Sequence, residues 1–159
     1  MLSRTTAEDL IKMASDLRMD WFQGVYSMDT LPDTIEKRNT LFITNTDSSN
    51  LPGTHWIAVV IRDGRGYCFD PLGYPPPTWL GKWMSTHVEK WSSNSRQVQT
   101  YFTHLCGHFC IHFLYHCTLL NFEDTPYVII LNQLYPVKYD KNIYEHIIMN
   151  FFKLYHSKK

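Results

Sequence analysis

Four residues whose types occur together in acyl transfer by a thiol lie along the chain in the order His55, Asp70, Gln99 and Cys106. In that chemistry a thiolate attacks a carbonyl carbon, a histidine handles the proton and a carboxylate orients the histidine. An amide group then donates a hydrogen bond to the oxyanion that develops. We therefore predict Cys106 as the nucleophile, His55 as the general base, Asp70 as its orienting carboxylate and Gln99 as the oxyanion donor.

His55 and Asp70 are predicted to meet across a β-hairpin. A continuous apolar run predicts a buried strand over His55–Arg62, Asp63-Gly64 is a strong hairpin signal, and Tyr67–Asp70 predicts the returning strand. With a two-residue loop, His55 is the diagonal neighbour of Asp70 on one face, about 7–8 Å away at the backbone. A four-residue loop shifts the register by two and keeps the same face. Either turn leaves the two side chains within reach of each other.

Cys106 stands where a loop enters an apolar segment, Cys106–Leu120, that predicts a buried helix. A helix N-terminus carries partial positive charge and free amide groups, which favour a thiolate and can donate to an oxyanion. Gln99 lies seven residues upstream and can supply a side-chain amide to the same place. A nearby imidazolium would further favour the thiolate at neutral pH.

The remaining patterns predict the elements that must position these residues. Thr5 and Glu8 have the spacing of a capping box at the start of a helix that continues to Leu17. Downstream, we expect a strand over Thr40–Thr46, a helix over Trp79–Trp91, a short strand over Gln97–Tyr101 and either a helix or a strand over Tyr127–Gln133. Asp140 is predicted to cap a last helix through Phe152, with Ile143, Ile147, Phe151 and Leu154 facing inward. The predicted fold is α+β: one domain over residues 1–159, with a small central mixed sheet, a buried helix carrying the cysteine, and flanking helices.

Composition narrows the function classes. The 159 residues are 44% hydrophobic and 19% charged, which is typical of a globular domain, and 15 basic residues balance 15 acidic ones. Zero net charge argues against a strongly basic nucleic-acid binder or an acidic tail protein. No apolar run is long enough to predict a membrane span, and Met1–Asp9 lacks the pattern of a secretory signal. Three of the four cysteines lie within twelve residues, which favours reduced thiols in an intracellular protein over a disulfide framework.

The order of several motifs resembles adenain, the adenovirus-type processing cysteine protease, which belongs to the same clan as the SUMO-specific proteases. The resemblance covers roughly Thr5 to Leu120. It is carried by the motifs Asp20–Tyr26 (DWFQGVY), Phe42–Thr46 (FITNT), Gly53–Trp56 (GTHW), Phe69–Tyr74 (FDPLGY), Val98-Gln99, and Cys106–Cys110 (CGHFC).

The resemblance implies the same four roles for His55, Asp70, Gln99 and Cys106. It adds Trp56, which would pack beside the histidine and favour the imidazolium through a cation–π contact. It also adds Gly107, which would leave the approach to the thiol uncrowded. The implied activity is endoproteolytic cleavage of viral structural precursor proteins at Gly-containing sites during virion maturation, in the host nucleus and the virion.

The resemblance further implies two activating partners: DNA, and a short viral peptide held by a disulfide to a cysteine upstream of the catalytic glutamine. Thr86–Val98 contains no cysteine, which argues against that tether, and the neutral net charge argues against activation by DNA. From the sequence we expect no required cofactor, no metal and no membrane partner.

Three alternatives stay open from the sequence. One is a ubiquitin-like-protein protease of the SUMO type, which uses the same chemistry on a Gly-Gly tail, and another is an inactive binding module with this fold. The presence of all four catalytic residue types argues against the inactive module. The third is a zinc site, because histidines recur at every fourth residue among three cysteines. That step drifts 40° around a helix, so only adjacent pairs share a face. The residues concerned are His104, His108, His112, His116, Cys106, Cys110 and Cys117.

Overall fold

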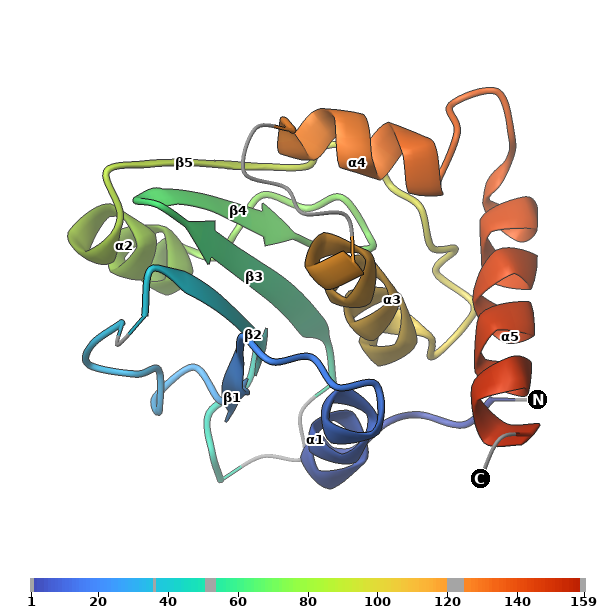
Figure 1. Ribbon diagram of the computed structural model, residues 1–159, viewed down its shortest axis with the longest axis horizontal. Helices are drawn as coiled ribbons and strands as arrows, with labels where there is room; N and C mark the ends of the chain where they lie inside the picture. The colour runs from blue at the N-terminus through green and yellow to red at the C-terminus, as the bar shows by residue number, and fades with distance from the viewer. Residues whose placement is uncertain (1, 36, 51–53, 120–124, 158–159) are drawn as a thin grey trace.

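A five-stranded mixed sheet with helices on both faces organises the chain (Figure 1). The computed structural model describes residues 2–35, 37–50, 54–119 and 125–157. Its elements are α1 (Ala7–Asp16), β1 (Phe22–Tyr26), β2 (Asn39–Asn45), β3 (Trp56–Arg62), β4 (Arg65–Phe69), α2 (Thr78–His87), β5 (Lys90–Ser93), α3 (Cys106–Leu119), α4 (Tyr127–Leu134) and α5 (Lys141–Ser157). The predicted α+β class is confirmed. Gly53 of the GTHW motif and Leu120 at the end of the predicted helix lie outside the described residues.

The strands lie in the order β1-β2-β3-β4-β5, with parallel pairs at both edges and antiparallel pairs in the centre. The predicted hairpin is confirmed: Arg62 pairs with Arg65, so Asp63-Gly64 is a two-residue loop. Both loop residues have positive φ, 50° and 76°, as a type I′ turn requires. This turn fixes the register that carries His55 and Asp70 to the same end of the hairpin.

Each face of the sheet has its own core, because β3 is buried on both sides. On one face Ala58 and Val60 pack toward α3, together with α1, α4 and α5. On the other face Ile57 and Val59 pack toward α2. Figure 1 shows this sandwich, with α2 on one side of the central strands and α3 on the other. Alternation along β3 therefore assigns successive residues to different cores.

Two sequence predictions in the middle of the chain need correction, and one open alternative is decided. The helix predicted over Trp79–Trp91 is wrong at its C-terminal end, since α2 ends at His87 and Trp91 lies in β5. Gln97–Tyr101 is irregular, because the backbone amides of Val98 and Gln99 both donate to the carbonyl of Pro71 and not to a strand. The segment left open over Tyr127–Gln133 is a helix, α4.

The two terminal helices are present where the sequence predicts them, but the capping residues of α1 and the buried face of α5 differ from the prediction. α1 is capped by Thr6 with Asp9 in a capping box, one residue after the predicted pair Thr5 and Glu8. Asp140 does cap α5, by accepting from the amide of Ile143 at 3.2 Å. Of the residues predicted to face inward on α5, Ile147 and Phe151 are partly buried and pack against the core, whereas Ile143 and Leu154 are 39% and 63% exposed. The buried residues on this helix are Tyr144, Glu145, Ile148, Phe152 and Tyr155.

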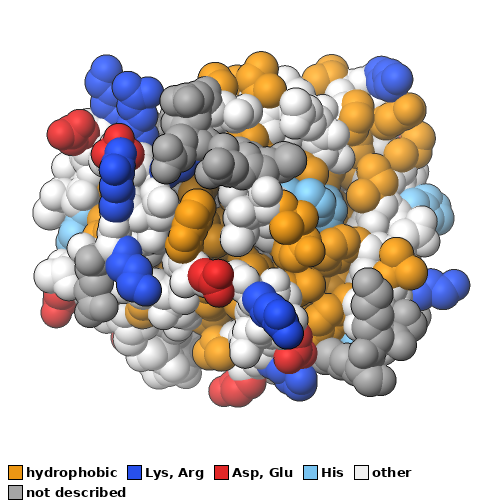
Figure 2. Space-filling model, in the orientation of Figure 1, with side chains coloured by type: hydrophobic (Ala, Val, Ile, Leu, Met, Phe, Trp, Pro, Cys, Tyr) orange, Lys and Arg blue, Asp and Glu red, His pale blue; other side chains and the backbone are white. Residues whose placement is uncertain are grey.

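The surface seen in Figure 2 is apolar across its middle and right, over α3 and α5. Exposed Leu154 lines a groove of about 560 Å³ between α1, α3 and α5. Within the part of the chain that the structure describes, no helix combines the length and apolarity that crossing a membrane would require.

Candidate active site

The hairpin brings His55 and Asp70 into direct contact. His55 immediately precedes β3 and Asp70 immediately follows β4, and their Nε2 and Oδ1 atoms are 2.7 Å apart. Asp70 is 4% exposed, so this charge-assisted contact lies away from bulk solvent. The hairpin parity deduced from the sequence thus leads to an actual His–carboxylate pair.

Cys106 is the first residue of α3 and faces the same histidine. With Nε2 turned to Asp70, Nδ1 is the ring nitrogen left for the Cys106 thiol. Burial lowers the pKa of His55, but hydrogen bonds to Asp70 and to Cys106 and their negative charges outweigh it, raising that pKa to about 9. His55 is therefore an imidazolium at neutral pH, which is the partner that an active thiolate needs.

Asn94, just beyond β5, holds the backbone of Asp70 from both sides. Its side-chain oxygen accepts from the Asp70 amide at 2.8 Å, and its nitrogen donates to the Asp70 carbonyl at 2.6 Å. The Asp70 carboxylate also accepts from the amide of Leu72 at 2.8 Å. Sequence analysis did not find Asn94. Its partner is 24 residues away, and no local pattern in the sequence marks the pairing.

Gln99 is buried beside the cysteine and linked to the Asp70 loop. Its own amide and that of Val98 donate to the carbonyl of Pro71, at 3.0 and 2.8 Å. Its side-chain nitrogen donates to the carbonyl and hydroxyl oxygens of Thr103, at 3.0 and 3.3 Å. A primary amide has two N–H groups. Gln99 Oε1 is buried and has no hydrogen-bond partner among the described residues, and donation to an oxyanion would use the N–H that does not face Thr103.

Trp56 and Gly107 both meet the segment that precedes α1. The Trp56 indole N–H donates to the carbonyl of Thr5 at 3.4 Å. A Cβ at position 107 would lie 2.0 Å from the Thr5 hydroxyl oxygen, so a glycine is needed for that approach. The structure thus gives both residues a packing role. The cation–π contact and the open approach to the thiol stay predictions.

A cleft of about 400 Å³ gives access to these groups. The rings of Tyr74 and Tyr101 stack at its rim, with centroids 6.3 Å apart, and their side chains are about half exposed. The lining residues are Arg4, Thr46, Thr54, His55, Leu72, Tyr74, Gln99, Thr100, Tyr101, Thr103, His104 and Cys106.

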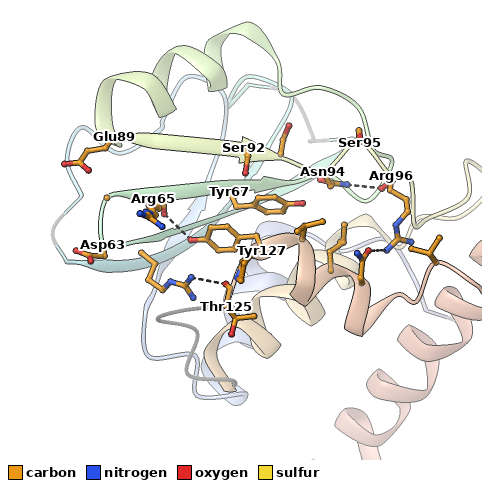
Figure 3. Close-up of a pocket in the computed structure, with 18 residues that line it drawn as sticks. Asp63, Arg65, Tyr67, Glu89, Ser92, Asn94, Ser95, Arg96, Thr125 and Tyr127 are labelled. Carbon is orange, nitrogen blue, oxygen red and sulfur yellow. Dashed lines mark hydrogen bonds between the residues drawn. The ribbon is translucent and has the colours of Figure 1, made fainter.

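A larger cavity, of about 1140 Å³, lies elsewhere, between the ends of β4 and β5 and helix α4 (Figure 3). Tyr67 and Tyr127 stack within it with ring centroids 4.9 Å apart, and Arg96 lies at its far end, but its lining as described contains no cysteine. It shares Asn94 with the scaffold of Asp70. Volume alone would select this cavity, whereas the chemistry selects the smaller cleft.

The histidine series along α3 does not converge on a metal. His108 is buried against Phe152, His112 Nδ1 is 2.8 Å from the hydroxyl of Tyr135, and His116 bonds to the carbonyl of His112. Over residues 2–35, 37–50, 54–119 and 125–157, no three His, Cys, Asp or Glu side chains form a group that could hold a metal ion.

Comparison with known proteins identifies the fold. No family model matches the sequence, and no curated protein sequence matches it. A crystal structure of ASFV pS273R protease matches 91% of this chain at 12% identity with a TM-score of 0.56. The selenomethionine structure of that protease matches 67% of this chain at 17% identity with a TM-score of 0.46. The matches span 64% and 41% of those two chains. The α+β fold of this chain is of the kind found in this protease.

Proposed function

We propose that this protein is a cysteine endopeptidase with Cys106, His55 and Asp70 as its catalytic residues. The observation that carries the proposal is the 2.7 Å pair of His55 and Asp70 facing the thiol of Cys106 at the start of α3. Two supporting facts are the cleft that opens onto these groups and the raised pKa of His55.

The proposed reaction uses each group at a stated atom. The Cys106 Sγ thiolate attacks the peptide carbonyl carbon, and the oxyanion accepts hydrogen bonds from Gln99 Nε2 and from free amides at the start of α3. The His55 Nδ1 proton passes to the leaving amine as the C–N bond breaks. Water then loses a proton to His55 and attacks the thioester, which releases the acid and regenerates the thiolate.

In its finer form the proposal is an adenain-like enzyme that cleaves viral structural precursor proteins at Gly-containing sites during virion maturation. The motif resemblance supports this substrate class, and with it a location in the host nucleus and the virion. A viral peptide and DNA are the activators to test. The missing cysteine in Thr86–Val98 leads us to expect that any peptide binds without a disulfide.

The test of the activity is the pH dependence of iodoacetamide labelling at each cysteine, read by mass spectrometry. We expect selective labelling of Cys106 well below pH 8, lost in His55→Ala and kept in His146→Ala, a variant of an exposed histidine on α5. Cys68, Cys110 and Cys117 are the internal controls because burial raises the pKa of each thiol. Equal, slow labelling of all four thiols would contradict the proposal.

The test of the substrate class compares two kinds of substrate. One is a panel of extended peptides containing Gly at the scissile bond. The other is a folded ubiquitin-like protein with a fluorophore on its Gly-Gly tail. We expect cleavage of the peptides. Exclusive cleavage of the ubiquitin-like substrate would select the deconjugating alternative.

A further inference from the structure

A buried carboxylate on α5 contacts the segment that joins Gln99 to Cys106. Glu145 is 6% exposed, and its Oε2 accepts from the hydroxyls of Thr103 and Thr100 at 2.8 and 3.3 Å. Figure 1 shows this segment running between α3 and α5 on its way into α3. Burying a carboxylate without hydrogen-bond donors is unfavourable, and the two threonine hydroxyls offset this cost for Glu145.

The contact continues to the proposed oxyanion donor. The Thr103 hydroxyl donates its hydrogen to Glu145 Oε2, so its oxygen lone pairs remain to accept from another donor. The Gln99 side-chain nitrogen then donates to the Thr103 hydroxyl and carbonyl oxygens. Glu145 thereby fixes which side of Thr103 faces Gln99, and Thr103 fixes the nitrogen end of the Gln99 amide.

We propose that Glu145 is a positioning residue for the oxyanion hole, acting through Thr103 on Gln99. The inference rests on the proposed function. It gives the C-terminal helix a part in the active site, although that helix contributes no residue to the lining of the cleft. Precision here matters because small displacements of a donor weaken transition-state stabilisation strongly.

The test uses two reagents that react with the same thiol by different routes. With iodoacetamide, the thiolate displaces iodide at a saturated carbon. An S–C bond forms, iodide leaves and no oxyanion develops. p-Nitrophenyl acetate is attacked at its carbonyl, passes through a tetrahedral oxyanion, expels p-nitrophenolate and leaves an acetyl thioester on Cys106. The ratio of the acylation rate to the alkylation rate therefore reports on the oxyanion hole separately from the thiolate.

We expect Gln99→Ala to lower acylation about 10²-fold, as removal of an oxyanion donor does. Glu145→Gln and Thr103→Val each should lower it about 10-fold, because the donor is misplaced but not removed. Alkylation at Cys106 should stay unchanged in all three variants. The matched control is Glu89→Gln, which removes the same charge at an exposed position beside β5 and should leave both rates unchanged.

Each outcome decides the matter. A lowered ratio in Glu145→Gln, with Thr103→Val lowered as well, supports the proposal, and Glu145→Asp, which shortens the side chain but keeps its carboxylate, replaces Glu145→Gln if that variant does not fold. Unchanged rates with both reagents overturn it. An equal fall in both rates also overturns it, because that result indicates a general structural role. If the unmodified protein shows no preference for Cys106 with either reagent, it is the proposed function that fails.

Discussion

His55 in the cleft is partly buried and His108 and His112 on α3 are almost fully buried, yet their pKa values move in opposite directions. The pKa of His55 rises to about 9 because Asp70 and Cys106 contact it and outweigh burial. The pKa of His108 falls to about 4 and that of His112 to about 3, mainly through burial and also through the positive charge of nearby His156 and His116. Burial by itself therefore favours a neutral core histidine, whereas contacts with Asp70 and Cys106 favour the imidazolium form of His55.

The largest effect should come from removing the cleft histidine. His55→Ala should lower both alkylation and acylation of Cys106 at pH 7 by about 10³-fold, because the thiolate loses its counter-ion and the reaction loses its proton donor. Stopped-flow or mass-spectrometric rates measure this. His146→Ala, at an exposed position, is the control. An equal loss of rate in His146→Ala would contradict a specific role for His55.

Removing the Asp70 carboxylate should lower the pKa of His55 in the direction seen for the core histidines. Asp70→Asn should lower the alkylation rate about 10²-fold at pH 7, because the hydrogen bond and negative charge that raise the pKa of His55 are lost. In the unmodified protein, the rate at which iodoacetamide alkylates Cys106 should show a step as pH rises through about 9, where His55 loses its proton. We expect this step to move to lower pH in Asp70→Asn and to stay in place in Asp20→Asn.

The same pKa shift links His55 to stability with a definite sign. Since its pKa in the folded state exceeds the ordinary 6.5, its contribution to the free energy of unfolding is complete below pH 6.5 and is lost as pH rises through about 9. Thermal unfolding between pH 6.5 and 9 should therefore be more sensitive to pH in the unmodified protein than in Asp70→Asn. Equal sensitivity would contradict the pairing.

The core histidines should show the opposite dependence. Their folded-state pKa values lie below 6.5, so the unfolded chain binds more protons and stability falls as pH falls from 6.5. Between pH 6.5 and 5 each should lower the free energy of unfolding by about 2 kcal/mol. Urea titrations should show this loss halved in His108→Gln and nearly abolished in the double variant with His112→Gln. An unaltered acid response in the double variant would rule out the core histidines as its source.

The smallest effect should come from the polar scaffold behind the cleft. Asn94→Ala leaves the amide and carbonyl of Asp70 without their side-chain partners and should lower Cys106 alkylation about 10-fold, since the carboxylate is displaced but still present. Asn150→Ala on α5 is the control. Labelling rates equal to those of the unmodified protein would show that Asp70 is held without Asn94.

The sequence by itself determined the features that depend on neighbours in the chain. A two-residue turn and alternation along two strands place His55 beside Asp70, and an apolar run after a loop starts the helix at Cys106. These relations need only local periodicity and turn chemistry, so they could be deduced from the order of residues.

The tertiary structure alone decided the contacts between distant segments. On α5 the tertiary packing buries Tyr144, Ile148 and Phe152 and leaves Ile143 and Leu154 exposed, although local periodicity predicts the last two as inward. Asn94 reaches Asp70 across 24 residues, and Thr103 reaches Glu145 across 42. The pKa values of the histidines were decided in the same way, because they depend on which charges lie nearby in space and not on the residues adjacent in the chain.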